Sequence, residues 1–338
     1  MTKRGILERF SDGPVLGAEG YLFELERRGY VKAGPYVPEA VLDYPGAVRE
    51  LHREFLFAGA EVMVAFTYYG HREKLKAVGR EIDLEQLNRQ AVRLAAETAA
   101  EGGALVAGNL SNTWAWDPSD PEGSRKRVDP MFEEQVRWAA EEGVDFFIAE
   151  TYDCLGEAQA ALKAVRASGL PAMVTFIALG EKSTDGYPWQ EACRILEQEG
   201  AQIVGLNCAR GPATMLGLVE KIRGAVHCRV AAQPVPYRTT AAQPIFQELR
   251  EPGCPCAFPL RLDPFVHTRF EMADFALQAR DLGVDYIGIC CGGAPHHVRA
   301  MAEALGRRVP ASRYSPDLSL HPVLGSGLSS CRDEEQVP

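Results

Sequence analysis

Short apolar runs alternate with longer amphipathic stretches along most of this 338-residue chain. The apolar runs show little polar alternation, which is typical of parallel strands buried on both faces. We expect strands at 15–18, 61–66, 104–108, 145–150, 172–176, 202–208, 229–233 and 286–290. Helical periodicity predicts helices at 21–29, 44–58, 84–101, 129–142, 154–168, 189–199, 214–223, 268–282 and 295–305. About eight strand–helix units in this length predict an α/β fold, the (β/α)8 TIM barrel.

The alternative fold is an open, doubly wound sheet, but no Gly-x-Gly-x-x-Gly turn follows a predicted strand. We assign residues 1–310 to the barrel, with a proline-rich insertion at 234–266. Cys254 and Cys256 in this insertion are either a metal-binding pair or part of a turn. Residues 311–338 are expected to form a C-terminal tail, because the composition turns irregular and the last residues are too polar to be buried.

The composition argues against several partners and locations. A formal net charge of −10 argues against a nucleic-acid partner. No apolar run approaches the roughly 20 residues of a membrane-spanning helix, and no apolar segment follows the basic start of the chain, so we expect neither a membrane anchor nor a signal peptide. Nine cysteines without framework spacing suit a reducing cytoplasm better than a disulfide scaffold.

Three cysteines lie where predicted strands end. Two are adjacent, in Gly288-Ile289-Cys290-Cys291-Gly292-Gly293, and Cys208 closes an earlier strand. Adjacent strand residues point to opposite faces, so the backbone must leave the pleat there, as the flanking glycines permit. Three thiolates would hold Zn²⁺ tetrahedrally with one position open, as in catalytic sites. The alternative is that these cysteines are small buried hydrophobes.

Other polar residues are predicted to lie at the same face, because the active site of this barrel is at the carboxyl ends of the strands. Glu150 ends an apolar strand, and it either contacts substrate or pairs with a loop Arg or Lys. Aromatic residues in the loops are either anchors or a binding surface for onium cations. The polar residues are Glu19, Thr67, Asn109, Glu150, Asn207 and Gln233, and the aromatic ones are Tyr36, Tyr68, Tyr69, Trp114 and Trp116.

A zinc ion with one open position activates water or binds a substrate thiol. Histidines that could serve as a general base are few, and His296 and His297 fall at the start of a helix. Thiolate-rich zinc suits a sulfur ligand, and a coordinated thiol is deprotonated at neutral pH. These residues therefore favour a thiol nucleophile and alkyl transfer.

At these residues the chain resembles the homocysteine S-methyltransferase family, and within it the betaine branch. The markers are Gly205-Leu206-Asn207-Cys208, Gly288-Ile289-Cys290-Cys291-Gly292, Arg28-Gly29-Tyr30-Val31-Lys32-Ala33-Gly34-Pro35 and Leu51-His52-Arg53-Glu54-Phe55-Leu56. The resemblance implies a zinc-dependent barrel that moves a methyl group from an onium donor to homocysteine, giving methionine. It implies that Cys208, Cys290 and Cys291 are the zinc ligands. It also implies that Glu150 holds the homocysteine amine or adjoins the donor, and that Tyr69 lines the donor pocket.

The chain departs from the family pattern in four ways. Ala18-Glu19 stands in place of Asp-Gly, so the substrate-binding carboxylate is missing or displaced to Glu19. Tyr36 replaces a Trp of the donor cage, Thr151 replaces a Tyr, and the long C-terminal arm used in oligomer assembly is not in the sequence. From the resemblance we expect Glu150 and Tyr69 to be catalytic. The residues expected to bind substrate are Glu19, Tyr36, Thr67, Tyr69, Glu150 and Asn207.

A homo-oligomer is possible. Two other functions are also consistent with these residues. One is the same fold acting with another donor, such as S-methylmethionine or dimethylsulfoniopropionate, or with another acceptor thiol. The other is a non-catalytic protein that binds zinc or a thiol.

Overall fold

Eight parallel strands form a single sheet in the computed structural model of this chain, which describes residues 3–253 and 255–320. The strands are β1 (Val15–Leu16), β2 (Val62–Val64), β3 (Leu105–Ser111), β4 (Phe146–Tyr152), β5 (Ala172–Phe176), β6 (Ile203–Asn207), β7 (Arg229–Gln233) and β8 (Tyr286–Ile287). They follow the order β1-β8-β7-β6-β5-β4-β3-β2. Strands β2 to β6 are buried along their whole length. The predicted (β/α)8 barrel is confirmed.

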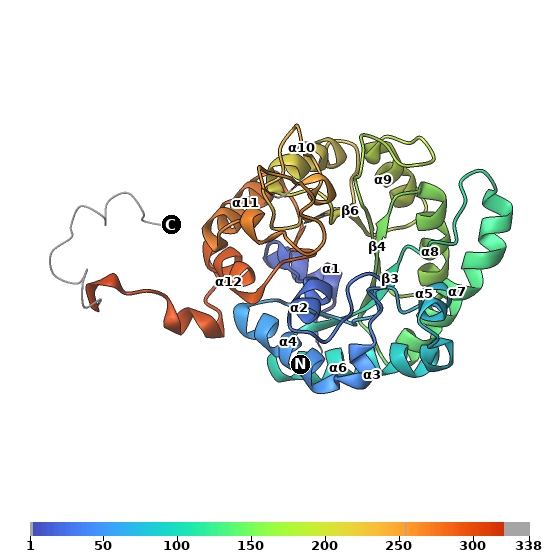
Figure 1. Ribbon diagram of the computed structural model, residues 1–338, viewed down its shortest axis with the longest axis horizontal. Coiled ribbons are helices and arrows are strands. Elements are labelled where there is room, and N and C mark those ends of the chain that lie inside the picture. Colours follow the sequence, from blue (N-terminus) through green and yellow to red (C-terminus); the bar gives the residue numbers. More distant parts are fainter. Residues whose placement is uncertain (1–2, 254, 321–338) are drawn as a thin grey trace.

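Helices surround the strands (Figure 1). The longer ones are α4 (Pro45–Ala58), α6 (Leu84–Gly102), α7 (Pro121–Glu141), α8 (Leu155–Ala167), α9 (Trp189–Gln198), α10 (Pro212–Arg223), α11 (Arg269–Asp281) and α12 (Pro295–Ala304). Shorter ones are α1 (Ile6–Arg9), α2 (Tyr21–Arg27), α3 (Ala40–Asp43) and α5 (Arg72–Ala77). No helix in the described ranges is long and apolar enough to cross a membrane.

One predicted helix start was wrong, and another helix begins at the predicted residue without a side-chain cap. Helix α7 begins at Pro121 rather than near residue 129, because Asp120 caps it by accepting from the Gly123 amide at 3.0 Å. Pro130 then lies inside the helix. Asp83 is at the N-cap of α6, but its carboxylate makes no capping hydrogen bond and instead pairs with Arg80 at 2.7 Å.

The segment at 234–266 follows β7 and contains the short 3-10 helices Phe246–Glu248 and Asp263–Phe265. It packs back on the barrel: the Phe246 amide donates to the Ala209 carbonyl at 2.8 Å, and the Phe246 ring stacks on Tyr237. Cys256 is exposed, whereas Cys254 lies outside the described residues. Of the predicted tail, 321–338 also lies outside them. The 3-10 helix Pro310–Tyr314 packs against α4 and α12 with Ala311 buried, and the described residues after it extend away from the barrel (Figure 1).

Hydrogen bonds between Leu16 of β1 and Glu61, just before β2, close the barrel between these two strands. The Glu61 amide donates to the Leu16 carbonyl at 2.8 Å, and the Glu61 carboxylate accepts from the Leu16 amide at 2.8 Å. Arg307, just after α12, donates to both the Glu61 carboxylate and the Pro14 carbonyl. The Arg307 side chain is 25% exposed, so this contact is only partly screened by solvent.

We expect Arg307→Met to lower the free energy of unfolding by about 1–2 kcal/mol, because charge-assisted hydrogen bonds to Glu61 and Pro14 are lost. Arg308→Met is the matched control: Arg308 is exposed and forms no ion pair with any described residue. Denaturant unfolding of both variants measures the difference. Equal stability of the two variants would show that Arg307 does not contribute to closing the barrel.

Candidate active site

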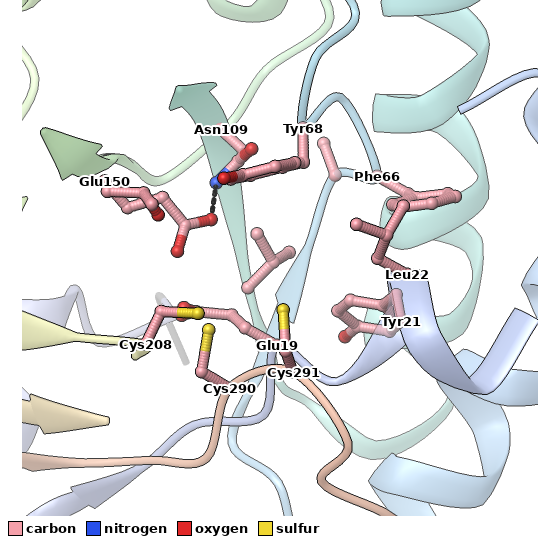
Figure 2. Close-up of a pocket in the computed structure, with 13 residues that line it drawn as sticks. Glu19, Tyr21, Leu22, Phe66, Tyr68, Asn109, Glu150, Cys208, Cys290 and Cys291 are labelled. Atoms are coloured by element: carbon pink, nitrogen blue, oxygen red, sulfur yellow. Dashed lines mark hydrogen bonds between the residues drawn. The ribbon is translucent and has the colours of Figure 1, made fainter. Parts of the chain in front are cut away.

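Three cysteine sulfurs meet at the carboxyl ends of β6 and β8. Cys208 follows β6 directly, and Cys290 and Cys291 lie in the loop after β8. The Sγ atoms of all three lie within 4.8 Å of one another. Cys208 and Cys290 are buried, and Cys291 is partly exposed. Figure 2 shows the three sulfurs directed toward a shared space, which the predicted ligand set requires.

Two glycines allow the loop after β8 to turn both adjacent thiols inward. Gly292 has φ +86°, a value that favours glycine, and the Gly293 amide donates to the Cys290 carbonyl at 2.8 Å. A Cβ on Gly20 would lie 2.0 Å from the Gly293 carbonyl oxygen. The loop that carries Glu19 is therefore packed directly against the loop that carries the thiols.

The three thiols cannot all ionise without a compensating cation. The pKa of Cys208 lies well below its usual value, because the Cys290 and Cys291 thiols donate hydrogen bonds to its sulfur. The same contacts with Cys208 raise the pKa of Cys290 and Cys291. The ionised forms of these three neighbouring thiols therefore compete with one another. A thiophilic divalent cation would balance three thiolates, so this set of ligand atoms fits zinc.

Two buried carboxyl groups lie beside the thiols. Asn109 donates to Glu150 at 2.6 Å and Asn207 donates to it at 2.9 Å, while Gln233 donates to Glu19. Burial, and then the Cys290 charge, raises the pKa of Glu150 to about 8. Burial, and then the Glu150 charge, raises that of Glu19. No Lys or Arg in the described chain pairs with Glu150, so the expected alternative of a salt bridge is wrong.

Asn207, the last residue of β6, connects these groups by hydrogen bonds. Its Nδ2 donates to Glu150 and, at 2.7 Å, to the Thr151 hydroxyl. Its Oδ1 accepts from the Thr151 amide and the Thr175 hydroxyl, both at 2.9 Å. The amide of Asn207 thereby orients the Glu150 carboxyl from behind.

Two connected cavities adjoin the thiols. A small one, of about 30 Å³, is lined by Glu19, Glu150 and the three cysteines. A larger one, of about 610 Å³, shares five lining residues with it: Leu22, Tyr68, Thr151, Cys208 and Cys291. The aromatic residues lining the larger cavity are Phe23, Tyr36, Tyr68, Tyr69, Trp114, Trp116, Phe246 and Phe258.

Left-handed backbone conformations gather at the larger cavity. Six non-glycine residues in the described ranges have positive φ, and five of them line this cavity. Such conformations are costly for residues with a Cβ and persist where the surrounding structure imposes them, typically at functional sites. The five are Tyr36 (φ 52°), Tyr69 (59°), Trp114 (61°), Thr151 (67°) and Cys208 (58°).

The structure brings most of the predicted site residues to these cavities. Glu19 and Glu150 line the small one, and Tyr36 and Tyr69 line the large one. Thr67 and Asn207 are buried behind the lining, with the Thr67 hydroxyl donating to the Asn109 carbonyl at 2.7 Å. Their predicted contact with substrate stays a prediction.

Sequence reasoning missed several lining residues. Tyr21 and Leu22, at the start of α2, were assigned only to a helix, although they follow Glu19 directly. Lys74 on α5 was missed because that helix was not predicted. Phe246 and Phe258 lie in the segment read as an insertion. The aromatic character of Phe246 and Phe258 was the only sequence signal that could have indicated these two residues.

The fold and the site together define a class of protein, the parallel barrels that carry a cluster of thiols at their strand ends. The family model for homocysteine S-methyltransferases matches residues 20–305. Betaine–homocysteine S-methyltransferase 1 of Mus musculus is 40% identical over 339 residues, covering 97% of this chain and 80% of that protein. S-methylmethionine–homocysteine S-methyltransferase of Rattus norvegicus is 38% identical, covering 97% and 88%. The chain belongs to the homocysteine S-methyltransferase family and is a methyltransferase, as its sequence predicted.

Solved structures share the fold. The oxidized form of the Escherichia coli homocysteine methyltransferase MmuM superposes with a TM-score of 0.70 at 20% identity, covering 89% of this chain and 99% of that one. The metallated form gives 0.69 at the same identity, covering 88% and 99%. At this identity the likeness supports the barrel architecture alone.

We expect Asn207→Leu to lower the free energy of unfolding by about 3 kcal/mol, because it leaves the Thr151 amide and Thr175 hydroxyl unpaired in the interior. Thr175→Val removes only one of these hydrogen bonds, so its loss should be about 1 kcal/mol. Denaturant unfolding of both variants tests the ranking. A larger loss in Thr175→Val would contradict the central position of Asn207.

Proposed function

We propose that this protein transfers a methyl group from betaine or a related onium compound to homocysteine, giving methionine, at a zinc ion held by Cys208, Cys290 and Cys291. The observation that carries the proposal is the cluster of three sulfurs within 4.8 Å, at the base of an aromatic-lined cavity. The relatives named for betaine and for S-methylmethionine support the acceptor and the class of donor. The E. coli enzyme with this fold has been solved in a metallated form.

When bound, zinc would lower the pKa of the acceptor thiol and keep it as a thiolate at neutral pH. The residues of the chain then orient the acceptor. The small cavity places two carboxyl groups beside the sulfurs, and an amino acid ammonium group is a suitable partner for them. We assign Glu150 and Glu19 to this ammonium group, with Asn109, Asn207 and Gln233 holding the carboxyls in place.

The donor would lie in the larger cavity with its onium group against aromatic faces, as quaternary ammonium ligands prefer. The acceptor sulfur attacks a methyl carbon in line, so an S–C bond forms as the C–N or C–S bond breaks. The electron pair stays on the leaving nitrogen or sulfur, which becomes a neutral amine or thioether. Because the leaving group takes up no proton, the site needs no general acid, and positioning supplies much of the acceleration.

The choice of donor is the open part of this proposal. Tyr36 takes the place of the Trp in the family pattern; it lies parallel to Phe23, with ring centroids 5.7 Å apart, and lines the larger cavity. A tyrosine face attracts cations more weakly than a tryptophan face. S-methylmethionine and dimethylsulfoniopropionate are therefore candidate donors beside betaine. Incubation of the purified protein with homocysteine and each donor, followed by methionine detection, tests the function directly.

We expect Cys291→Ala to lose bound zinc and methyl transfer together, because two thiolates hold zinc much more weakly than three. Cys256→Ala is the control, since Cys256 is exposed and lies in the segment at 234–266. Zinc content by elemental analysis and methionine formation are measured on both variants. Full zinc occupancy in a Cys290→Ala/Cys291→Ala variant, or loss of zinc in Cys256→Ala, would show that the metal is bound elsewhere.

We expect Glu150→Gln to retain zinc and the fold but to lower kcat/KM for homocysteine by roughly 100-fold, because an amide cannot ionise to the carboxylate that a bound substrate ammonium group would favour. Gln is close in size and can still accept from Asn109. Kinetics with varied homocysteine, alongside the unfolding midpoint, separate binding from stability. An unchanged kcat/KM would assign Glu150 a purely structural role.

A further inference from the structure

Lys74 on the short helix α5 reaches into the larger cavity. Its Nζ lies 4.2 Å from the centroid of the Tyr69 ring and 5.0 Å from that of the Trp114 ring. These two rings contact each other edge to face, with centroids 6.4 Å apart. An ammonium group at this distance from two aromatic faces is held by cation–π attraction. Lys74 therefore has a defined place at the cavity wall.

No acidic side chain in the described residues pairs with Lys74. Two carboxyl groups line the same cavity, and both accept hydrogen bonds from other groups: Glu157 from Thr113 at 2.5 Å and Asp153 from Thr184 at 2.9 Å. Burial lowers the pKa of Lys74, as expected for an ammonium group that has left bulk water without a counter-ion. The larger cavity thus holds an ammonium group for which the described residues supply aromatic contacts but no carboxylate partner.

Lys74 lies at the outer end of a row of residues that starts at the thiols. Tyr68 lines both cavities, and its ring contacts that of Tyr69 at a centroid distance of 4.3 Å. Tyr69 in turn contacts Trp114 and Lys74. Lys74 lines only the larger cavity. A molecule that directs a methyl group at the thiols and extends along Tyr68 and Tyr69 would bring its far end to Lys74.

We propose that Lys74 is the residue that binds the carboxylate of the methyl donor and so favours donors with an acidic arm over onium compounds without one. This inference rests on the proposed function and adds a specificity-determining residue to it, because betaine, dimethylsulfoniopropionate and S-methylmethionine all carry a carboxylate. The onium group faces the inner aromatic rings and the acceptor sulfur, while the carboxylate pairs with the Lys74 ammonium. An onium compound without a carboxylate gains nothing from Lys74 and meets a like charge in the cavity.

The test compares two sulfonium donors that differ by the acidic arm, dimethylsulfoniopropionate and trimethylsulfonium, with homocysteine as acceptor. Unmodified protein, Lys74→Met, Lys74→Arg and Lys76→Met are assayed as zinc-loaded full chains, with zinc content and melting temperature measured for each. Lys76 is the control, because it lies on the same helix, is exposed and does not line the cavity.

We expect Lys74→Met to lower kcat/KM for dimethylsulfoniopropionate by roughly tenfold or more, since a charge-assisted contact is lost. For trimethylsulfonium, kcat/KM should be unchanged or raised. Lys74→Arg should keep most of the preference, and Lys76→Met all of it. An equal fall with both donors, or an equal rise because Lys74 only occupies the aromatic surface, would overturn the inference while leaving the proposed function intact. Absence of turnover by unmodified protein with either donor or with betaine would overturn the proposed function itself.

Discussion

Acidic groups are crowded at one end of this barrel, and the rest of the site depends on how their charge is compensated. Three thiols and two carboxyls surround a cavity of about 30 Å³, and no Lys or Arg within the described part of the chain forms an ion pair with them. Burying such groups is costly unless hydrogen bonds or opposite charges compensate. Amide donors from Asn109, Asn207 and Gln233 provide part of that compensation. The proposed ligands would provide the rest, because zinc, an ammonium group and an onium group are all cations.

This arrangement depends on the parallel barrel, which brings the ends of all its strands to one face. Two residues at these strand ends have a left-handed backbone conformation: Cys208, directly after β6, and Thr151, within β4. Because Asn207 ties the Thr151 backbone and the Glu150 carboxyl to β6, the strained residues and the acidic groups form one connected structure. Hydrogen bonds in a buried network hold side chains in fixed positions, and the Asn207 side chain uses both its oxygen and its nitrogen in this one. The strand ends therefore preorganise the acidic groups, whereas the aromatic loops beyond them line the larger cavity.

The alternation of apolar runs and helices predicted the barrel, because hydrophobic periodicity depends on local geometry that the fold retains. The thiol cluster was predictable from the position of the cysteines at strand ends, because a closed barrel brings the carboxyl ends of β6 and β8 to the same face. Other features depend on contacts between distant residues. The side-chain cap from Asp120 places the start of α7 before the predicted residue 129, and the position of Lys74 depends on the rings of Tyr69 and Trp114. Thr67 was expected at the cavity surface, but its hydroxyl is turned back to the Asn109 carbonyl.

Glu19 illustrates how a site tolerates a shift along the chain. The family pattern has an acidic residue one position earlier, where this chain has Ala18, which is fully buried. The Glu19 amide donates to the Ile289 carbonyl at 3.0 Å, so the backbone is tied to the thiol-bearing loop just after β1 ends. From there the Glu19 side chain, one methylene longer than that of Asp, reaches Gln233 and lies beside Glu150. A longer side chain one residue further on thus delivers a carboxyl group to the cavity. The missing aspartate therefore gives no reason to regard the proposed homocysteine site as lost. The other two substitutions relative to the family pattern, Tyr36 and Thr151, line the larger cavity, which is the one proposed for the donor.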